Sequence, residues 1–224
     1  MKVVAVVPAY NESQVIGAVI KGLRPFVATV VVVDDGSYDG TAEVAAAQGA
    51  VVLRHFLNRG QGAAISTGLR YAVDCGADTV VTIDADGQHR ADEIPRLLEP
   101  LLLDRFDVVL GSRFMAGKNA NAIPRLRRFL LQAAVAFDRL RTGLKITDTH
   151  NGFRAFSRHA ASVVQIHYDG MAHASEILDE ITRLNLRYTE VPVSVQYTAY
   201  ARVKGQRGTH GFSILRDLLL RRFL

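Results

Sequence analysis

The chain has 224 residues, of which 49% are hydrophobic and 22% are charged. This balance excludes a mainly disordered chain and is typical of a globular domain. The single cysteine, Cys75, cannot form an intrachain disulfide, which fits a reducing compartment. No apolar run approaches the roughly 20 residues that a membrane-spanning helix needs, and the N-terminal residues do not follow a secretory signal pattern. We therefore expect a domain that is not integral to a membrane.

The charge of the chain is unevenly distributed. Lys and Arg number 27 against 22 Asp and Glu, which gives a net charge of +5 and a pI near 9.6. Residues 113–145 contain eight basic side chains and one acid, whereas the first 111 residues lean acidic. A basic second half predicts an anionic partner, but it does not separate nucleic acid, acidic lipid and phosphorylated small molecules.

The first half alternates short β-branched runs with helical patterns. Strands are expected at residues 3–7, 30–33, 51–53, 79–83 and 108–110, and helices at 15–23, from 41 onward, at 63–73 and at 91–103. Asp39 or Thr41 is the expected N-cap of the second helix. This alternation predicts a mostly parallel sheet covered by helices on both faces. In such sheets ligands bind at the carboxyl ends of the strands.

The second half is less regular. A helix that is both basic and apolar is expected over 125–141, a mixed segment over 148–157, a further helix over 173–184 and a strand over 188–196. A polar loop then covers 197–211 and a short basic amphipathic helix covers 212–224. We expect one catalytic domain over residues 1–211. The pattern of the final helix fits a membrane surface or docking on the protein body equally well.

Polar and acidic motifs follow the expected strands. They are Pro8-Ala9-Tyr10-Asn11-Glu12, Asp34-Asp35-Gly36-Ser37, Asn58-Arg59-Gly60-Gln61-Gly62 and Asp84-Ala85-Asp86-Gly87-Gln88-His89. At a strand end the alternation of side chains lets Asp84 and Asp86 project to the same side. Carboxylate oxygens suit Mg²⁺ or Mn²⁺, and such an ion can neutralise a departing diphosphate. Each motif alone also has a plain explanation as a turn or a cap, and their order and spacing carry the prediction.

In this combination the motifs resemble family 2 glycosyltransferases of the GT-A fold, and within them the dolichyl- and polyprenyl-phosphate sugar synthases. Gly111-Ser112-Arg113-Phe114 and Asn151-Gly152-Phe153-Arg154 extend the likeness. The resemblance implies a Rossmann-like three-layer α/β/α sandwich with a mostly parallel central sheet. It also implies an inverting transferase that moves a hexose from a GDP- or UDP-sugar to a polyprenyl or dolichyl phosphate with Mg²⁺ or Mn²⁺.

The resemblance assigns roles to residues of this chain. A nucleotide site is implied at Pro8, Ala9, Tyr10, Glu12, Asp35, Gly36, Gly62, Asp84, Ala85 and Asp86. Asp86 matches the principal metal ligand, and Gln88 matches a second one. A loop over 199–206 with Arg202 and Lys204 corresponds to one that closes over the diphosphate in related enzymes; an ordinary surface loop fits the same residues.

A lipid phosphate acceptor is already an anionic nucleophile, so it needs cations to hold it rather than a general base. Arg113, Arg125 and Arg127 are the candidates, with Arg113 and Arg127 favoured, beside the apolar run 129–137. A solvated basic helix face is the alternative explanation of that cluster. Such an enzyme is expected in the cytoplasm, peripheral on the cytoplasmic face of the membrane, without nucleic acid as a partner.

Two other functions stay open at this point. The same donor chemistry with a soluble glycan, protein or small-molecule hydroxyl as acceptor would need a base, for which Glu176 or Asp179 is the candidate. A non-catalytic nucleic-acid-binding domain would use the basic second half. The acidic strand ends and the lack of an interleaved aromatic and basic motif count against the latter.

Overall fold

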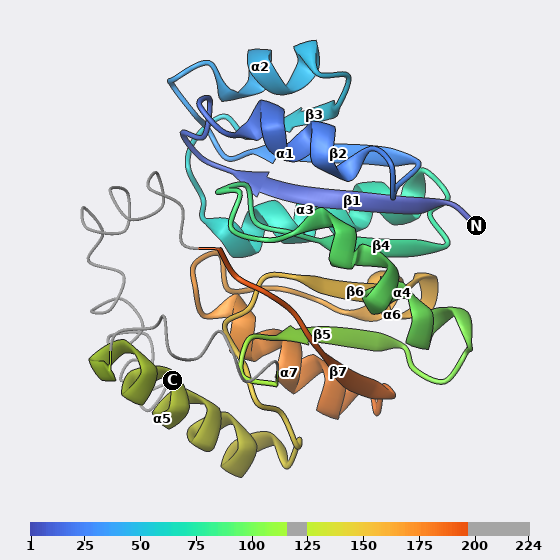
Figure 1. Cartoon of the computed structure of the whole chain (residues 1–224), viewed down its shortest axis with the longest axis vertical. Coiled ribbons are helices and arrows are strands. Elements are labelled where there is room, and N and C mark those ends of the chain that lie inside the picture. Colours follow the sequence, from blue (N-terminus) through green and yellow to red (C-terminus); the bar gives the residue numbers. More distant parts are fainter. Residues whose placement is uncertain (116–124, 197–224) are drawn as a thin grey trace.

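The computed structural model describes residues 1–115 and 125–196, and these ranges form a seven-stranded sheet with helices on both faces (Figure 1). The elements in chain order are β1 (Val3–Ala9), α1 (Ile16–Leu23), β2 (Thr29–Asp34), α2 (Thr41–Ala47), β3 (Val51–Arg54), α3 (Gln61–Asp74), β4 (Thr79–Thr82), η1 (Ala91–Glu93), α4 (Ile94–Leu102), β5 (Val108–Ser112), α5 (Arg125–Thr142), β6 (Arg154–Ser157), α6 (Arg158–Val163), α7 (His173–Arg183) and β7 (Tyr188–Pro192). The predicted three-layer α/β/α architecture is confirmed.

The strand order is β3-β2-β1-β4-β6-β5-β7, and only β6 runs antiparallel to its neighbours. Arg154 at the start of β6 is opposite Thr82 at the end of β4 and opposite Leu110 in β5. The segment that enters β6 therefore lies at the edge where the parallel strands end. The sheet is mostly parallel, as predicted, although the antiparallel strand was not foreseen.

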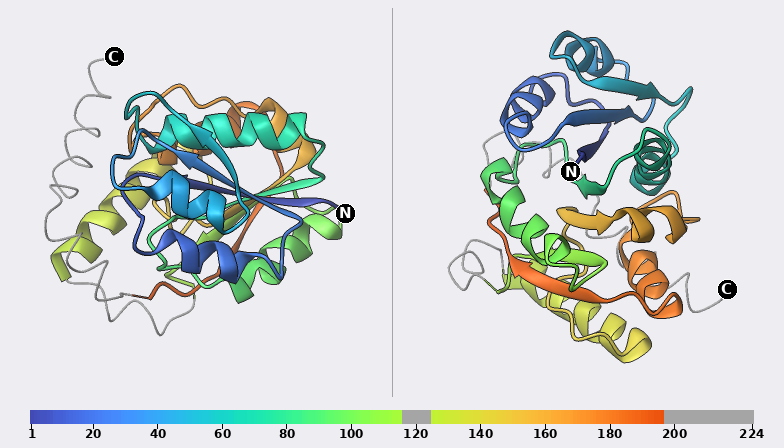
Figure 2. Two further views of the ribbon diagram at one scale, coloured as in Figure 1. Left: turned by 90° about the horizontal axis from the view of Figure 1, so that it is seen from above. Right: turned by 90° about the vertical axis from the view of Figure 1, so that its right-hand side faces the viewer.

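Two apolar clusters fill the space between the sheet and its helices. Helices α3, α6 and α7 pack on one face, with Ile65, Leu69 and Ile177 among the buried side chains. Helices α1, α2 and α4 cover the other face, where Ile20 and Leu97 are fully buried. The two views of Figure 2 show these layers, with α5 lying outside them. Strand residues buried on both faces explain the unbroken valine runs of β1 and β2.

Two local expectations need correction, and one helix was not expected. The N-cap of α2 is Gly40, with φ +85°, and not Asp39 or Thr41; the carboxylate of Asp39 instead accepts a hydrogen bond from the Thr41 amide at 3.1 Å. The last strand ends at Pro192 rather than at residue 196, because its parallel partner β5 ends at Ser112. Helix α6 was not predicted, since six residues are too short to show helical periodicity. Its signal was Ser157, whose hydroxyl caps the Ala160 amide at 3.1 Å.

The predicted loop 197–211 and helix 212–224 lie outside the described residues. None of the described helices is long and apolar enough to cross a membrane.

Candidate active site

The predicted motifs meet at one edge of the sheet. Strands β1, β2, β3 and β4 are parallel, so the residues that follow them share the carboxyl edge, where the arrowhead of β1 lies in Figure 1. The side chains of Pro8 and Ala9 are buried within β1, so these two residues offer the site mainly their backbone. The strand order therefore agrees with the prediction that these motifs lie on one rim of the sheet.

The loops after β1 and β2 are joined by hydrogen bonds. The Asn11 amide donates to the Ser37 hydroxyl at 2.9 Å, and the Glu12 amide donates to the Thr41 hydroxyl at 2.8 Å. Asn11 adopts φ +54°, a left-handed conformation that asparagine tolerates well. The rings of Tyr10 and Tyr38 meet edge to face, with centroids 6.4 Å apart, and both are exposed. This arrangement presents two aromatic faces at the edge of the site.

Asp35 fixes the loop that follows β3. Its carboxylate accepts hydrogen bonds from the amides of Arg59, at 3.0 Å, and Gly60, at 2.7 Å, and from His55 Nδ1 at 2.7 Å. Gly36 has φ +76°, and a Cβ there would lie 2.8 Å from the Asn58 amide nitrogen. The loop therefore requires glycine at position 36 because the backbones approach so closely. Contact of Asp35 and Gly36 with a nucleotide stays a prediction.

Asp84 and Asp86 follow β4, and Ala85 between them is buried. Burial alone would raise the pKa of Asp84, but the hydrogen bond and charge of His89, with the charges of His173 and Arg154, hold it below its ordinary value. Burial, and next the charge of Asp84, raise the pKa of Asp86 to about 6, and Glu12 adds to this effect. The two carboxylates and Glu12 are therefore close enough to repel one another, which favours a cation among them.

Gly62 is explained by packing against a distant loop. Its amide donates to the carbonyl of Asp169 at 2.7 Å, and a Cβ would collide with the Tyr168 carbonyl and lie 2.9 Å from the Cβ of His173. That loop is held by Glu176, whose carboxylate accepts hydrogen bonds from the amides of His167 and Tyr168, each at 2.9 Å. These contacts, which the sequence did not reveal, give both Gly62 and Glu176 a structural role.

Arg113 forms a buried ion pair. Its Nε and Nη2 donate to the two carboxylate oxygens of Asp148 at 2.7 and 2.9 Å, and its amide donates to the same carboxylate at 3.1 Å. Both side chains are less than a tenth exposed. Asp148 thus holds one side of the guanidinium, and contact of Arg113 with a phosphate stays a prediction.

The other predicted phosphate-binding cations are not tested by these contacts. Arg125 and Arg127 lie in the first turn of α5. Arg202 and Lys204 lie outside the described residues.

The charges of two buried basic side chains, Arg154 and His173, act on Asp84, and the sequence analysis gave neither residue a role in the site. Burial lowers the pKa of Arg154 to about 10, and its Nη2 donates to the carbonyl of Thr149 at 2.9 Å. Burial, with the charge of Arg154, lowers the pKa of His173 to about 4. Burial likewise lowers the pKa of His150. At neutral pH Arg154 is therefore the fixed cation that offsets the charge of Asp84.

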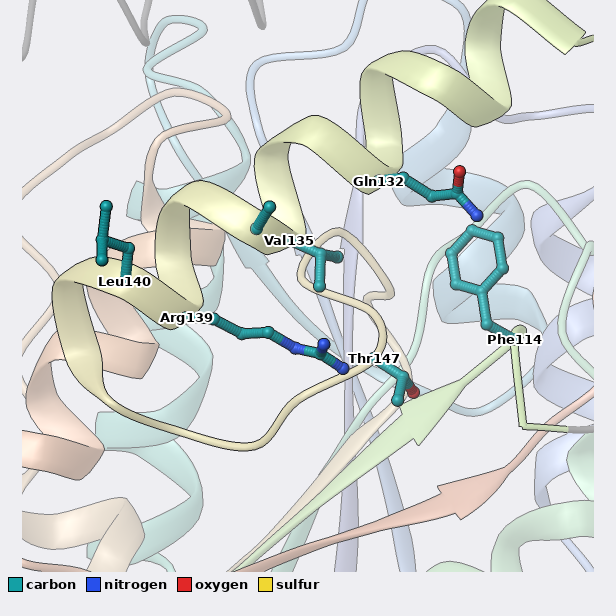
Figure 3. A pocket seen from close by; sticks show the side chains of 7 residues that line it. Phe114, Gln132, Val135, Arg139, Leu140 and Thr147 are labelled. Atoms are coloured by element: carbon teal, nitrogen blue, oxygen red, sulfur yellow. The ribbon is translucent and has the colours of Figure 1, made fainter.

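A cavity of about 750 Å³ lies under α5 (Figure 3). Its lining is mixed, with Phe114 and Val135 beside Gln132 and Thr147, and the side chain of Arg139 reaches across from α5 to donate to the Ile146 carbonyl.

Phe129 and Leu140 of α5 are exposed by 67% and 89%. Helix α5 is anchored to α7 by the Ser175 hydroxyl, which donates to Asp138 at 3.1 Å. Helix α5 therefore carries exposed apolar side chains, and one of them, Leu140, lines the cavity.

No group of three or more His, Cys, Asp or Glu side chains is arranged to hold a metal within residues 1–115 and 125–196. The acidic edge offers a metal one or two carboxylates, a number that suits Mg²⁺ or Mn²⁺ when a substrate diphosphate supplies further oxygens.

Comparison with known proteins identifies the family to which the chain belongs. The model of the family described as glycosyl transferase family 2 matches residues 4–164, and the chain belongs to this family. It is 31% identical over 235 residues to the UDP-N-acetylglucosamine–dolichyl-phosphate N-acetylglucosaminyltransferase of Methanococcus voltae, with 96% of this chain and 94% of that protein covered. It is 32% identical over 204 residues to the undecaprenyl-phosphate mannosyltransferase of Micrococcus luteus, with 87% and 83% covered. The chain is therefore a glycosyltransferase enzyme, as predicted.

Among solved structures, the chain resembles glucosyl-3-phosphoglycerate synthase from Mycobacterium tuberculosis, with a TM-score of 0.72 and 24% identity over 98% of this chain and 79% of that one. This likeness, with the family match, confirms the predicted GT-A type of fold.

Proposed function

We propose that this enzyme transfers a hexose from a GDP- or UDP-sugar to a polyprenyl or dolichyl phosphate, with inversion at the sugar and with Mg²⁺ or Mn²⁺ bound. The observation that carries the proposal is the acidic carboxyl edge: Asp84 and Asp86 follow β4, and Glu12 follows β1, the parallel neighbour of β4. The names of the Methanococcus and Micrococcus relatives, which are polyprenyl-type phosphate sugar transferases, support the acceptor.

The acidic edge fits a divalent cation. The raised pKa of Asp86 reflects an anion that lacks charge compensation, and a cation would supply it. Asp86 would hold the ion, with Gln88 as a second ligand, and the substrate diphosphate would complete its coordination. A bound ion would neutralise the negative charge that develops on the departing diphosphate. A related fold crystallised with Mn²⁺ and UDP-glucose provides a precedent.

The protein's own residues would orient the two anionic substrates. The nucleotide would lie over the loops of Tyr10, Glu12, Asp35 and Gly36, and Arg202 and Lys204 would close on its diphosphate. Arg113, Arg125 and Arg127 would hold the acceptor phosphate. A phosphate needs no base to become a nucleophile, and this agrees with the engagement of Glu176 in backbone hydrogen bonds.

The lipid part of the acceptor would lie along the apolar surface of α5. Phe129 and Leu140 of this helix are exposed, and Leu140 lines the cavity of Figure 3. An enzyme with such an acceptor would act at the cytoplasmic face of the membrane, in peripheral contact with its anionic surface.

The direct experiment supplies the enzyme with Mn²⁺, UDP- or GDP-hexoses and a short-chain polyprenyl phosphate. We expect a lipid-linked sugar from one nucleotide class and none when the metal is chelated. Transfer to a soluble glycan together with no transfer to the lipid phosphate would contradict the proposed acceptor.

A Glu176→Gln variant tests the acceptor class independently. We expect transfer within about threefold of wild type, because the carboxylate is a structural acceptor. The melting temperature should fall by a few degrees, since charge-assisted hydrogen bonds to two amides are weakened. Steady-state kinetics and thermal denaturation measure both effects. A hundredfold loss of turnover at unchanged stability would instead favour a hydroxyl acceptor with Glu176 as its base.

A further inference from the structure

The carboxylate of Asp84 is held from three directions. Gln61, the first residue of α3, donates from Nε2 to one oxygen at 2.8 Å. His89 donates from Nε2 to the other oxygen at 3.2 Å. Gly152 closes a third side, since a Cβ at that position would lie 2.6 Å from Asp84 Oδ2. Three separate segments of the chain therefore determine one position for this carboxylate.

His89 is itself rigidly placed. Its side chain is only 5% exposed, and its ring packs on the fully buried Phe153 with centroids 5.3 Å apart. Its backbone forms an antiparallel bridge with Val195, and the Gln196 amide donates to the Gln88 carbonyl at 2.8 Å. The imidazole therefore has a fixed direction from which it donates to Asp84.

Asp86 is held differently. Its carboxylate accepts the Gln88 amide at 3.0 Å, and within the described parts of the chain no side-chain hydrogen bond to it is found. The two neighbouring carboxylates therefore differ: Asp84 is fixed by side chains from α3 and from the segment after β4, and Asp86 retains freedom to take a ligand.

We propose that His89 and Gln61 are positioning residues that hold Asp84 in the orientation required for donor binding. Each carboxylate oxygen has two lone-pair directions, so a hydrogen bond to each still leaves acceptor capacity for a substrate hydroxyl. A carboxylate ordered in advance avoids the entropic cost of being ordered when the nucleotide sugar binds. This inference rests on the proposed donor site and assigns to it two residues outside the predicted set.

The test measures nucleotide affinity by calorimetric titration of the full chain with UDP and with GDP in the presence of Mn²⁺. His89→Leu keeps an apolar contact with Phe153 and removes the donor. We expect its affinity for the nucleotide to fall about tenfold to a hundredfold, as for the loss of a hydrogen bond to a charged group. Gln61→Ala should also lower the affinity for the nucleotide. His89→Gln, which restores an N–H, should recover most of the loss. The matched control is His159→Leu, because His159 is exposed in α6 at the opposite edge of the sheet. This variant should leave the affinity for the nucleotide unchanged.

A double-variant cycle separates positioning from general stability. In an Asp84→Ala background, His89→Leu should change the affinity by less than about twofold, because the residue through which it acts is gone. An affinity of His89→Leu equal to wild type would overturn the inference, as would the same loss in both backgrounds. Both outcomes leave the proposed function standing. If the wild-type protein binds neither nucleotide, the proposed donor site fails, and the inference fails with it.

Discussion

Replacement of Asp86 by asparagine is expected to lower glycosyl transfer by at least about a hundredfold while making the metal-free protein more stable. The loss of activity follows from removing the charge that would hold the cation at the departing diphosphate. The gain in stability follows from the pKa of Asp86, which burial and the charge of Asp84 raise to about 6. The difference from 3.8 corresponds to at most about 3 kcal/mol of cost for the ionised group at neutral pH.

The difference in stability between Asp86→Asn and wild type depends on pH. Because the folded-state pKa is raised, ionised Asp86 destabilises the protein above pH 6, and the cost disappears as the pH falls toward 3.8. In a chelating buffer the variant should therefore melt roughly 5 °C higher than wild type at pH 8, and the gap should close between pH 6 and pH 4. Thermal denaturation across this range measures it.

Asp74→Asn serves as the control, because Asp74 is exposed at the end of α3, on the far edge of the sheet. It should leave both turnover and stability unchanged. Full activity in Asp86→Asn would remove Asp86 from the proposed metal site.

Replacement of Asp148 by alanine has the largest expected effect on stability. The change leaves the guanidinium of Arg113 buried without the carboxylate that pairs with it on two nitrogens. Breaking such a pair on one side costs about 3–5 kcal/mol, which corresponds to a melting temperature lower by roughly 10 °C. Denaturant titration followed by circular dichroism measures the loss.

Two further variants make this result interpretable. Asp92→Ala breaks the exposed pair with Arg90, where both side chains are about half exposed, and should leave the denaturation midpoint nearly unchanged. The double variant Arg113→Met with Asp148→Leu removes both buried charges and should regain most of the stability. If Arg113 also contacts the acceptor phosphate, this stable double variant should show a KM for the acceptor at least about tenfold higher. An unchanged KM would limit Arg113 to its structural role.

The local sequence determined most of the elements and the location of the site. Short valine-rich runs are typical of strands buried on both faces, so β1 and β2 were predictable, and their parallel arrangement follows from the helix between them. The carboxyl ends of parallel strands meet at one edge, and this geometry alone groups Glu12, Asp35 and Asp84.

Only the tertiary structure decided the partners of the charged side chains. Arg113 and Asp148 are 35 positions apart in the chain, and Gln61 and Asp84 are 23 apart. Antiparallel β6 brings the segment of Asp148 and Gly152 to the carboxyl edge. Hydrophobic periodicity specifies which face of an element is buried, but it does not specify which distant element lies against that face. The pairing of Arg113 and the positioning of Asp84 therefore depend on strand order, which no local pattern in this sequence encodes.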